Sequence, residues 1–96
     1  MKIKLAKSEL IHFVGIGGIG MSGLALIMKD LGFKVQGSDI SNNKNIERLK
    51  KKKIKILIGH KKRNINKSTI LVISSAIKSS NPELKFAKER KIPIYK

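Results

Sequence analysis

The chain has 96 residues, no cysteine and a formal net charge of +16. This length allows one domain with a modest core, and the lack of cysteine excludes disulfides and thiolate metal sites. No apolar run approaches the roughly 20 residues that cross a bilayer, and the basic start lacks the apolar centre of a signal peptide. We therefore expect a cytoplasmic protein without a membrane segment, in which residues 1–8 form a frayed lead-in.

A strand over residues 9–14 leads into the glycine-rich run GIGGIG, and a helix follows at once. A G-x-G-x-x-G motif gains weight as a phosphate-binding loop when it joins a strand to a helix. We expect Gly15 to allow a sharp turn, Gly17 to let a diphosphate approach the backbone, and Gly20 to let the helix pack on the strand. The helix start would offer N–H groups and a positive dipole end to the anion. The same glycines would also fit a tight junction that binds nothing.

The helix is predicted over residues 18–31, and Gly32 ends it. Its inward face is predicted from residues at helical spacing, namely Met21, Leu24, Ala25, Met28 and Leu31. Next comes a strand over residues 33–38, which ends at Asp39. An acid about 20 residues beyond the glycine loop is typical of a carboxylate that binds ribose hydroxyls. Asp39 could instead cap the following helix, together with Ser41, Asn42 or Asn43.

A basic helix is predicted over residues 43–53 and a third strand over residues 54–58. His60 follows that strand at its carboxyl end, where open α/β sheets bind ligands, although a solvated loop histidine would fit the same position. His12 lies inside the first strand without a partner at metal-ligand spacing, so we interpret it as a structural residue. Residues 61–67 are predicted to be a polar loop.

The apolar, β-branched run over residues 68–73 predicts a strand buried on both faces. The small residues Ser74, Ser75 and Ala76 follow it, where they would allow a ligand to approach or would form a turn. The sequence SNPE from Ser80 reads as a capping box with proline in the first turn. It opens a helix that runs to Arg90, and a short strand over residues 92–95 completes the pattern.

These elements predict a Rossmann-like α/β domain over residues 1–96, with an open parallel sheet of about five strands. Right-handed crossovers favour the strand order 3-2-1-4-5, with helices on both faces and the ligand at the switch between strands 1 and 4. Lysines dominate the positive charge and spread along the chain, while only three arginines are present. Base readout favours arginine, so we expect no specific nucleic-acid partner.

Four blocks together resemble the amino-terminal domain of the Mur ligase family. They are IHFVGIGGIGMSGLA, then GSD at 37–39, IGH at 58–60 and SSAIKSSNPE from Ser74, and they cover nearly the whole chain. The likeness is strongest to the members that join L-alanine to UDP-N-acetylmuramate. Members that recycle a tripeptide onto the same nucleotide sugar remain an alternative, as does, outside the family, a regulatory NAD-binding module.

The resemblance implies that the domain binds UDP-N-acetylmuramate. By the family pattern, the diphosphate would contact Gly15, Gly17, Gly18, Ile19 and Gly20. Ser38 and Asp39 would lie on the uridine side of the ligand, and His60 would lie near the uracil. Ser74, Ser75 and Ala76 would form the rim near the diphosphate and the sugar. The family uses ATP and Mg²⁺ to activate the muramyl carboxylate as an acyl phosphate. The Walker-type loop for that ATP is absent from this sequence, and no carboxylate cluster could hold the metal. We therefore expect a substrate-binding domain without catalytic or metal-binding residues, which works with further domains of the same polypeptide.

Overall fold

The computed structural model describes residues 8–96, so most of the expected lead-in lies outside the described residues. Its five strands form one parallel sheet in the order β3-β2-β1-β4-β5, which confirms the predicted topology. The elements in chain order are β1 (Leu10–Val14), α1 (Ile19–Asp30), β2 (Lys34–Asp39), α2 (Lys44–Lys51), β3 (Lys55–Ile58), the 3-10 helix η1 (Lys62–Ile65), β4 (Ile70–Val72), α3 (Pro82–Glu89) and β5 (Ile94–Tyr95).

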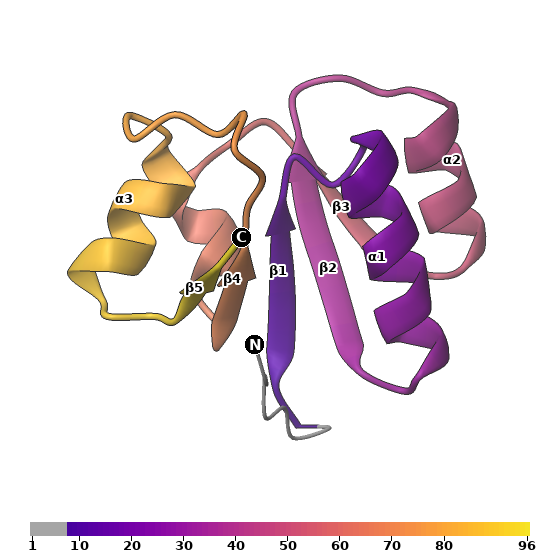
Figure 1. The fold of residues 1–96 in the computed structure, drawn as a ribbon, viewed down its shortest axis with the longest axis horizontal. Helices are drawn as coiled ribbons and strands as arrows, with labels where there is room; N and C mark the ends of the chain where they lie inside the picture. Colours follow the sequence, from indigo (N-terminus) through magenta and orange to yellow (C-terminus); the bar gives the residue numbers. More distant parts are fainter. Residues whose placement is uncertain (1–7) are drawn as a thin grey trace.

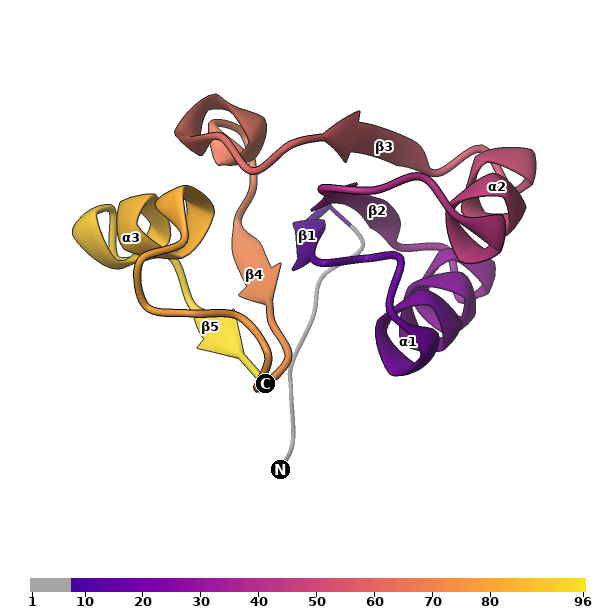
Figure 2. The same cartoon turned by 90° about the horizontal axis from the view of Figure 1, so that it is seen from above.

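Helices cover both faces of the sheet, as predicted. α1 and α2 pack on one face, whereas α3 and η1 lie on the other (Figures 1 and 2). Because successive strand residues point to opposite faces, Phe13 of β1 joins the core under α1 and α2, and Val14 joins the core under α3. The sheet therefore separates two apolar cores, and both are anchored on β1.

The carboxyl ends of the parallel strands meet at one edge of the sheet, which is the upper edge in Figure 1. We call it the carboxyl edge. The glycine loop follows β1 there, Asp39 ends β2, His60 follows β3 and Ser74 follows β4. Residues that are far apart in the sequence thus come together where α/β sheets bind ligands.

The inward face of α1 differs in part from the prediction. Ala25 is buried and Met28 packs against the core, but Leu24 is 43% and Leu31 57% exposed. Leu24 borders an apolar pocket of about 350 Å³ beside β4 and β5. Within residues 8–96 no helix covers that part of the sheet (Figure 2), which leaves the outer side of Leu24 open. Within residues 8–96 no helix has the length and apolar character to span a bilayer.

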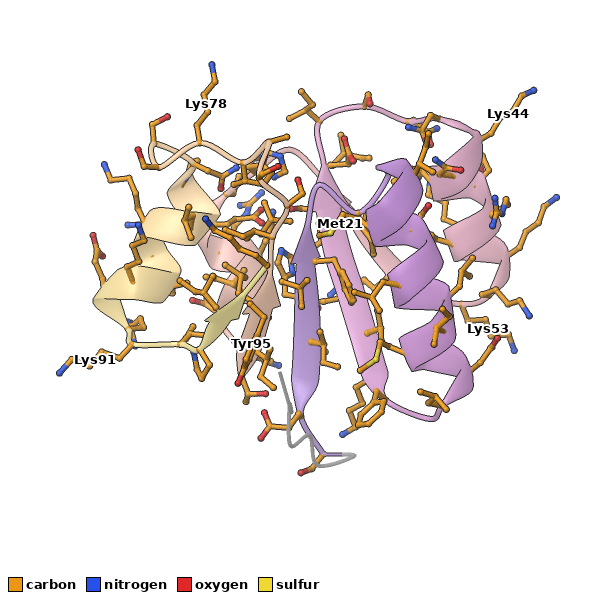
Figure 3. All side chains as sticks on the ribbon, viewed as in Figure 1. Met21, Lys44, Lys53, Lys78, Lys91 and Tyr95 are labelled. Carbon is orange, nitrogen blue, oxygen red and sulfur yellow. The ribbon has the colours of Figure 1, made fainter. Side chains whose placement is uncertain are left out.

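The positive charge is spread over the surface. Lys44, Lys53, Lys78 and Lys91 project outward from separate parts of the fold (Figure 3). Such isolated ammonium groups remain hydrated and raise the general attraction for anions. They do not form one docking face.

The glycine loop packs tightly on the sheet at Gly37 in β2. A Cβ atom at Gly37 would lie 2.5 Å from Ile16 Cδ1 and 2.7 Å from the carbonyl oxygen of Phe13. At Gly20 a Cβ atom would meet nothing within 4 Å. The expectation that Gly20 lets the helix pack on the strand was therefore wrong, because Gly20 is exposed and its Cβ position faces open space.

We predict that Gly37→Ala destabilises the domain by about 1–3 kcal/mol, because the methyl group would overpack against Ile16 and fixed backbone. Urea unfolding followed by circular dichroism measures this change. Gly23→Ala is the matched control, since a Cβ atom there also meets nothing within 4 Å and alanine favours a helix interior by roughly 0.5–1 kcal/mol. Equal stability of the two variants would contradict the packing role of Gly37.

Candidate functional site

The glycine loop is tied to the end of β2. Gly15 adopts a positive φ of 77°, which glycine allows without strain. The N–H groups of Gly15 and Ile16 donate to the carbonyl oxygen of Ser38 at 2.8 and 3.0 Å, and Gly18 N–H donates to the Gly15 carbonyl at 3.1 Å. The loop is thus held in place by main-chain hydrogen bonds.

Gly17 lies against the protein itself. Its N–H donates to Asp39 Oδ2 at 2.8 Å, and a Cβ atom there would lie 2.8 Å from that oxygen and 3.0 Å from Ile46 Cδ1. The space that glycine leaves at this position is therefore used by Asp39 and Ile46. Contact of Gly17 with a diphosphate stays a prediction, and a larger residue at Gly17 would disturb the loop as well as a ligand.

Asp39 fixes the start of the β2–α2 loop as well. Its Oδ1 accepts hydrogen bonds from the N–H groups of Ile40 at 2.8 Å and Ser41 at 3.2 Å. Asn43, and not Asp39, caps α2, because its side chain accepts from Ile46 N–H at 3.0 Å. A carboxylate has about four acceptor sites, so Asp39 retains capacity for one more donor.

The first turn of α1 offers N–H groups that the protein leaves free. Gly18 is the N-cap and supplies no side-chain cap, and no acceptor within residues 8–96 takes the N–H groups of Ile19, Gly20 or Met21. These amides lie at the positive end of the helix dipole. They are the strongest candidates for an anion contact in the glycine loop.

A groove of about 600 Å³ runs along this part of the carboxyl edge. Its walls come from the glycine loop, the end of β2, the cap of α2 and the segment after β4, and it is lined by Gly15, Gly17, Gly18, Ile19, Gly20, Met21, Asp39, Asn43, Ile73, Ser74, Ala76, Ile77 and Lys96. Figure 3 shows Met21 at the start of α1, beside the strand ends. Most of the predicted site residues therefore surround one groove.

Three of the predicted residues lie outside this groove. Ser75 is exposed and lines a neighbouring hollow. Ser38 is fully buried, and its hydroxyl contacts Nδ1 of His60 at 2.9 Å. Ser38 is therefore too deeply buried to contact a ligand directly. His60 is the member of this pair that reaches the surface at the carboxyl edge.

Glu83 is the residue that sequence reasoning missed. The predicted capping box was wrong, because Asn81 is the N-cap of α3 and accepts from the N–H groups of Glu83 at 2.9 Å and Leu84 at 3.3 Å. Pro82 occupies the first turn as predicted. The Glu83 side chain turns inward and is fully buried against the sheet.

The buried Glu83 carboxylate receives four hydrogen bonds from three parts of the chain. Oε1 accepts from His12 Nε2 at 2.7 Å and from the Ser38 hydroxyl at 2.6 Å. Oε2 accepts from the Asn64 amide at 2.7 Å and from Lys61 N–H at 3.1 Å. These donors fill the acceptor capacity of a carboxylate, and they join α3 to β1, β2 and the segment that carries η1.

His12 is a structural member of this network, in agreement with the sequence interpretation. The Gln36 amide nitrogen lies 2.8 Å from the Asn64 carbonyl oxygen and 2.8 Å from His12 Nδ1. The carbonyl can only accept, so this atom is the NH₂ group, and Nδ1 must accept its second proton. His12 is therefore neutral, and its Nε2–H donates to Glu83.

Within residues 8–96 no group of histidine and acidic side chains is arranged to hold a metal ion.

The surroundings of Glu83 favour its charged form. Burial alone would raise the pKa of its carboxyl group, but the hydrogen bonds from His12, Ser38 and Asn64, together with the attraction of the His12 imidazole in its protonated form, outweigh burial and lower the pKa below its ordinary value of 4.5. The only signal in the sequence was a set of polar residues on the inner side of two strands, at His12, Gln36 and Ser38. Their partner lies 71 residues beyond His12, at a spacing that no local motif specifies.

A family model described as "Mur ligase family, catalytic domain" matches residues 10–96. The chain belongs to the Mur ligase family. The resemblance deduced from the four sequence blocks is thus confirmed.

Relatives in the Mur ligase family include the UDP-N-acetylmuramate–L-alanine ligase of Pelagibacter ubique, which is 74% identical over all 96 residues of this chain. The solved UDP-N-acetylmuramate–alanine ligase of Thermotoga maritima is 38% identical with a TM-score of 0.85 over 88% of the chain. The solved UDP-N-acetylmuramate:L-alanyl-γ-D-glutamyl-meso-diaminopimelate ligase of Neisseria meningitides is 28% identical with a TM-score of 0.83 over 90% of the chain. The chain spans 21%, 20% and 28% of these three proteins, respectively.

We predict that Glu83→Gln lowers the free energy of unfolding by about 3 kcal/mol at neutral pH. The variant replaces one acceptor oxygen by an NH₂ group that faces donors, which leaves buried hydrogen-bonding groups unpaired. Chemical denaturation measures the loss. Glu89→Gln, at an exposed position of the same helix, is the control and should change stability by less than about 0.5 kcal/mol.

The stability of the domain should also depend on pH through Glu83. Because its pKa is lower in the folded than in the unfolded chain, the folded state holds fewer protons. The stabilisation is fully present above the ordinary value of 4.5 and is lost as the pH falls from there towards the lower folded-state pKa. Denaturation curves across this range should show the loss in the original protein and not in Glu83→Gln. The same slope in both proteins would contradict the assignment.

Proposed function

We propose that this chain is the UDP-N-acetylmuramate-binding domain of an ATP-dependent ligase that joins L-alanine to that nucleotide sugar. The observation that carries the proposal is the set of unpaired first-turn amides of α1 at the groove of the carboxyl edge. Family membership and the printed names of the relatives support the same substrate. All the site residues named above are assigned to substrate binding, and none to catalysis.

The charges around the groove favour one orientation of the bound ligand. The Asp39 carboxylate repels phosphate, and its remaining acceptor capacity suits a ribose hydroxyl. The amides of Ile19, Gly20 and Met21 attract phosphate. The diphosphate therefore lies at the start of α1, the ribose lies beside Asp39, and the sugar extends towards Ser74 and Ala76 after β4.

ATP and Mg²⁺ belong to other parts of the full ligase in this proposal. The chain spans about a fifth of the length of the L-alanine ligases it matches, and its sequence contains no Walker-type loop. We infer that further domains of the same polypeptide bind the nucleotide triphosphate and the amino acid. The isolated chain then binds the substrate without catalysing the reaction, and its cytoplasmic location stays a prediction.

A tripeptide-recycling ligase is the second candidate, because the L-alanyl-γ-D-glutamyl-meso-diaminopimelate ligase of Neisseria meningitides shares the fold at 28% identity. The L-alanine assignment is preferred because relatives with that name reach 74% identity over the whole chain. Both candidates use the same nucleotide sugar, so both make the same demands on this groove.

Titration of the ¹⁵N-labelled chain with UDP-N-acetylmuramate, UDP and NADH tests the proposal. We predict saturable shifts of the Ile19, Gly20, Met21 and Asp39 amide signals with both uridine ligands, and little response to NADH. Saturable binding of NADH without a response to UDP would favour the NAD-binding module instead.

A pair of variants at Gly20 tests the phosphate contact, since Gly20 is exposed and a Cβ atom there has open space. Gly20→Asp should weaken UDP binding at least about fivefold relative to Gly20→Asn, because a carboxylate near the diphosphate costs on the order of 1 kcal/mol even in water. An acid in the first turn favours the helix itself, so unfolding does not explain the loss. Equal affinities, measured by calorimetry, would show that the phosphates bind elsewhere.

A further inference from the structure

We propose that Glu83, acting through the Ser38 hydroxyl, fixes the proton of the His60 imidazole on Nδ1 and leaves Nε2 as a hydrogen-bond acceptor for the ligand base. Glu83 and Ser38 are then positioning residues, and His60 reads a base that carries an N–H donor. This inference rests on the proposed uridine ligand for its final step. The state of His60 itself is independent of that ligand.

The direction of the hydrogen bonds follows from the groups involved. An ionised carboxylate only accepts, so the single hydroxyl proton of Ser38 is donated to Glu83 Oε1 at 2.6 Å. Ser38 Oγ can then only accept from His60 Nδ1, which lies 2.9 Å away. Nδ1 therefore carries the proton. Glu83 Oε2 lies 3.6 Å from the same nitrogen and favours a proton there as well.

The chain of hydrogen bonds would reverse only if Glu83 were protonated. In that case the Glu83 carboxyl group would donate a hydrogen bond to Ser38 Oγ, and the Ser38 hydroxyl would donate to His60 Nδ1. The other three groups on the carboxylate, from His12, Lys61 and Asn64, are donors and oppose a proton on either oxygen. The lowered pKa of Glu83 agrees with the ionised form.

The opposite nitrogen of His60 faces outward. The His60 side chain is 15% exposed, and no residue within 8–96 forms a hydrogen bond with its Nε2. Every buried side-chain nitrogen and oxygen of the described residues has a partner, so Nε2 reaches solvent. A neutral imidazole thus presents an unshared acceptor at the carboxyl edge.

The order of the strands indicates what this acceptor meets. From the start of α1 the edge passes Asp39 at the end of β2 and then His60 after β3. A ligand with its diphosphate on the first-turn amides and its ribose at Asp39 extends its base towards His60. The N3–H group of uracil is a donor that matches Nε2, whereas N3 of cytosine is an acceptor and would face another acceptor. The relay therefore selects uracil over cytosine.

The tautomer can be measured without any ligand. Long-range ¹H–¹⁵N spectra of the chain at a pH about two units above the ordinary histidine pKa of about 6.5 distinguish the two neutral forms. We expect the Nδ1–H form for His60 and, as an internal reference, the Nε2–H form for His12. An Nε2–H form at His60 would overturn the relay, whatever the ligand.

Variants test whether Ser38 transmits the effect. Ser38→Ala should return His60 towards the Nε2–H form that histidine favours in water, and it should lower the ratio of UDP to CDP affinity about fivefold to tenfold. Ser68→Ala removes another buried hydroxyl, which lies 3.4 Å from the Gln36 amide and has no contact with His60. This control should leave both readouts unchanged.

The outcomes separate the inference from the function on which it rests. An unchanged tautomer or an unchanged affinity ratio in Ser38→Ala would reject the relay. A confirmed Nδ1–H form in a chain that binds neither UDP nor CDP would retain the relay and reject the proposed ligand. If Ser38→Ala does not fold, the tautomer of the original protein still decides the first step.

Discussion

A buried carboxylate is the constraint on which the rest of the structure depends. Glu83 has no access to water, so every acceptor site of its charged group must be filled from within the protein. The four donors come from β1, β2 and the segment between β3 and β4. These four hydrogen bonds set the position of α3 relative to the sheet. They also hold the ends of β2 and β3 beside the groove of the carboxyl edge.

The two faces of the sheet contribute different chemistry to the same edge. On the side of α1, main-chain N–H groups and the Asp39 carboxylate would distinguish an anion from a hydroxyl group. On the side of α3, the Glu83 network determines which nitrogen of His60 carries a proton. Phosphate, ribose and base would thus be recognised by separate groups that are already in place, which reduces the ordering cost of binding.

The sequence predicted the strands, their order and the glycine loop, because short apolar runs and glycine spacing are local signals that tertiary contacts reinforce. It did not predict the role of Glu83, since an S-x-x-E pattern at a helix start usually signals a cap, and only the long-range partner His12 distinguishes the two. It also missed the close approach at Gly37, which depends on how the loop folds back over β2. The predicted inward face of α1 was too broad, because within residues 8–96 no helix covers the sheet beside Leu24.

The crystal structure of the domain with UDP-N-acetylmuramate tests the account most directly. We predict diphosphate oxygens within hydrogen-bond distance of the Ile19, Gly20 and Met21 amides, and the uracil beside His60, with the four hydrogen bonds of Glu83 unchanged. A ligand bound in the apolar pocket beside β4 and β5 would contradict the account. So would a ligand at the carboxyl edge whose phosphates avoid the first turn of α1.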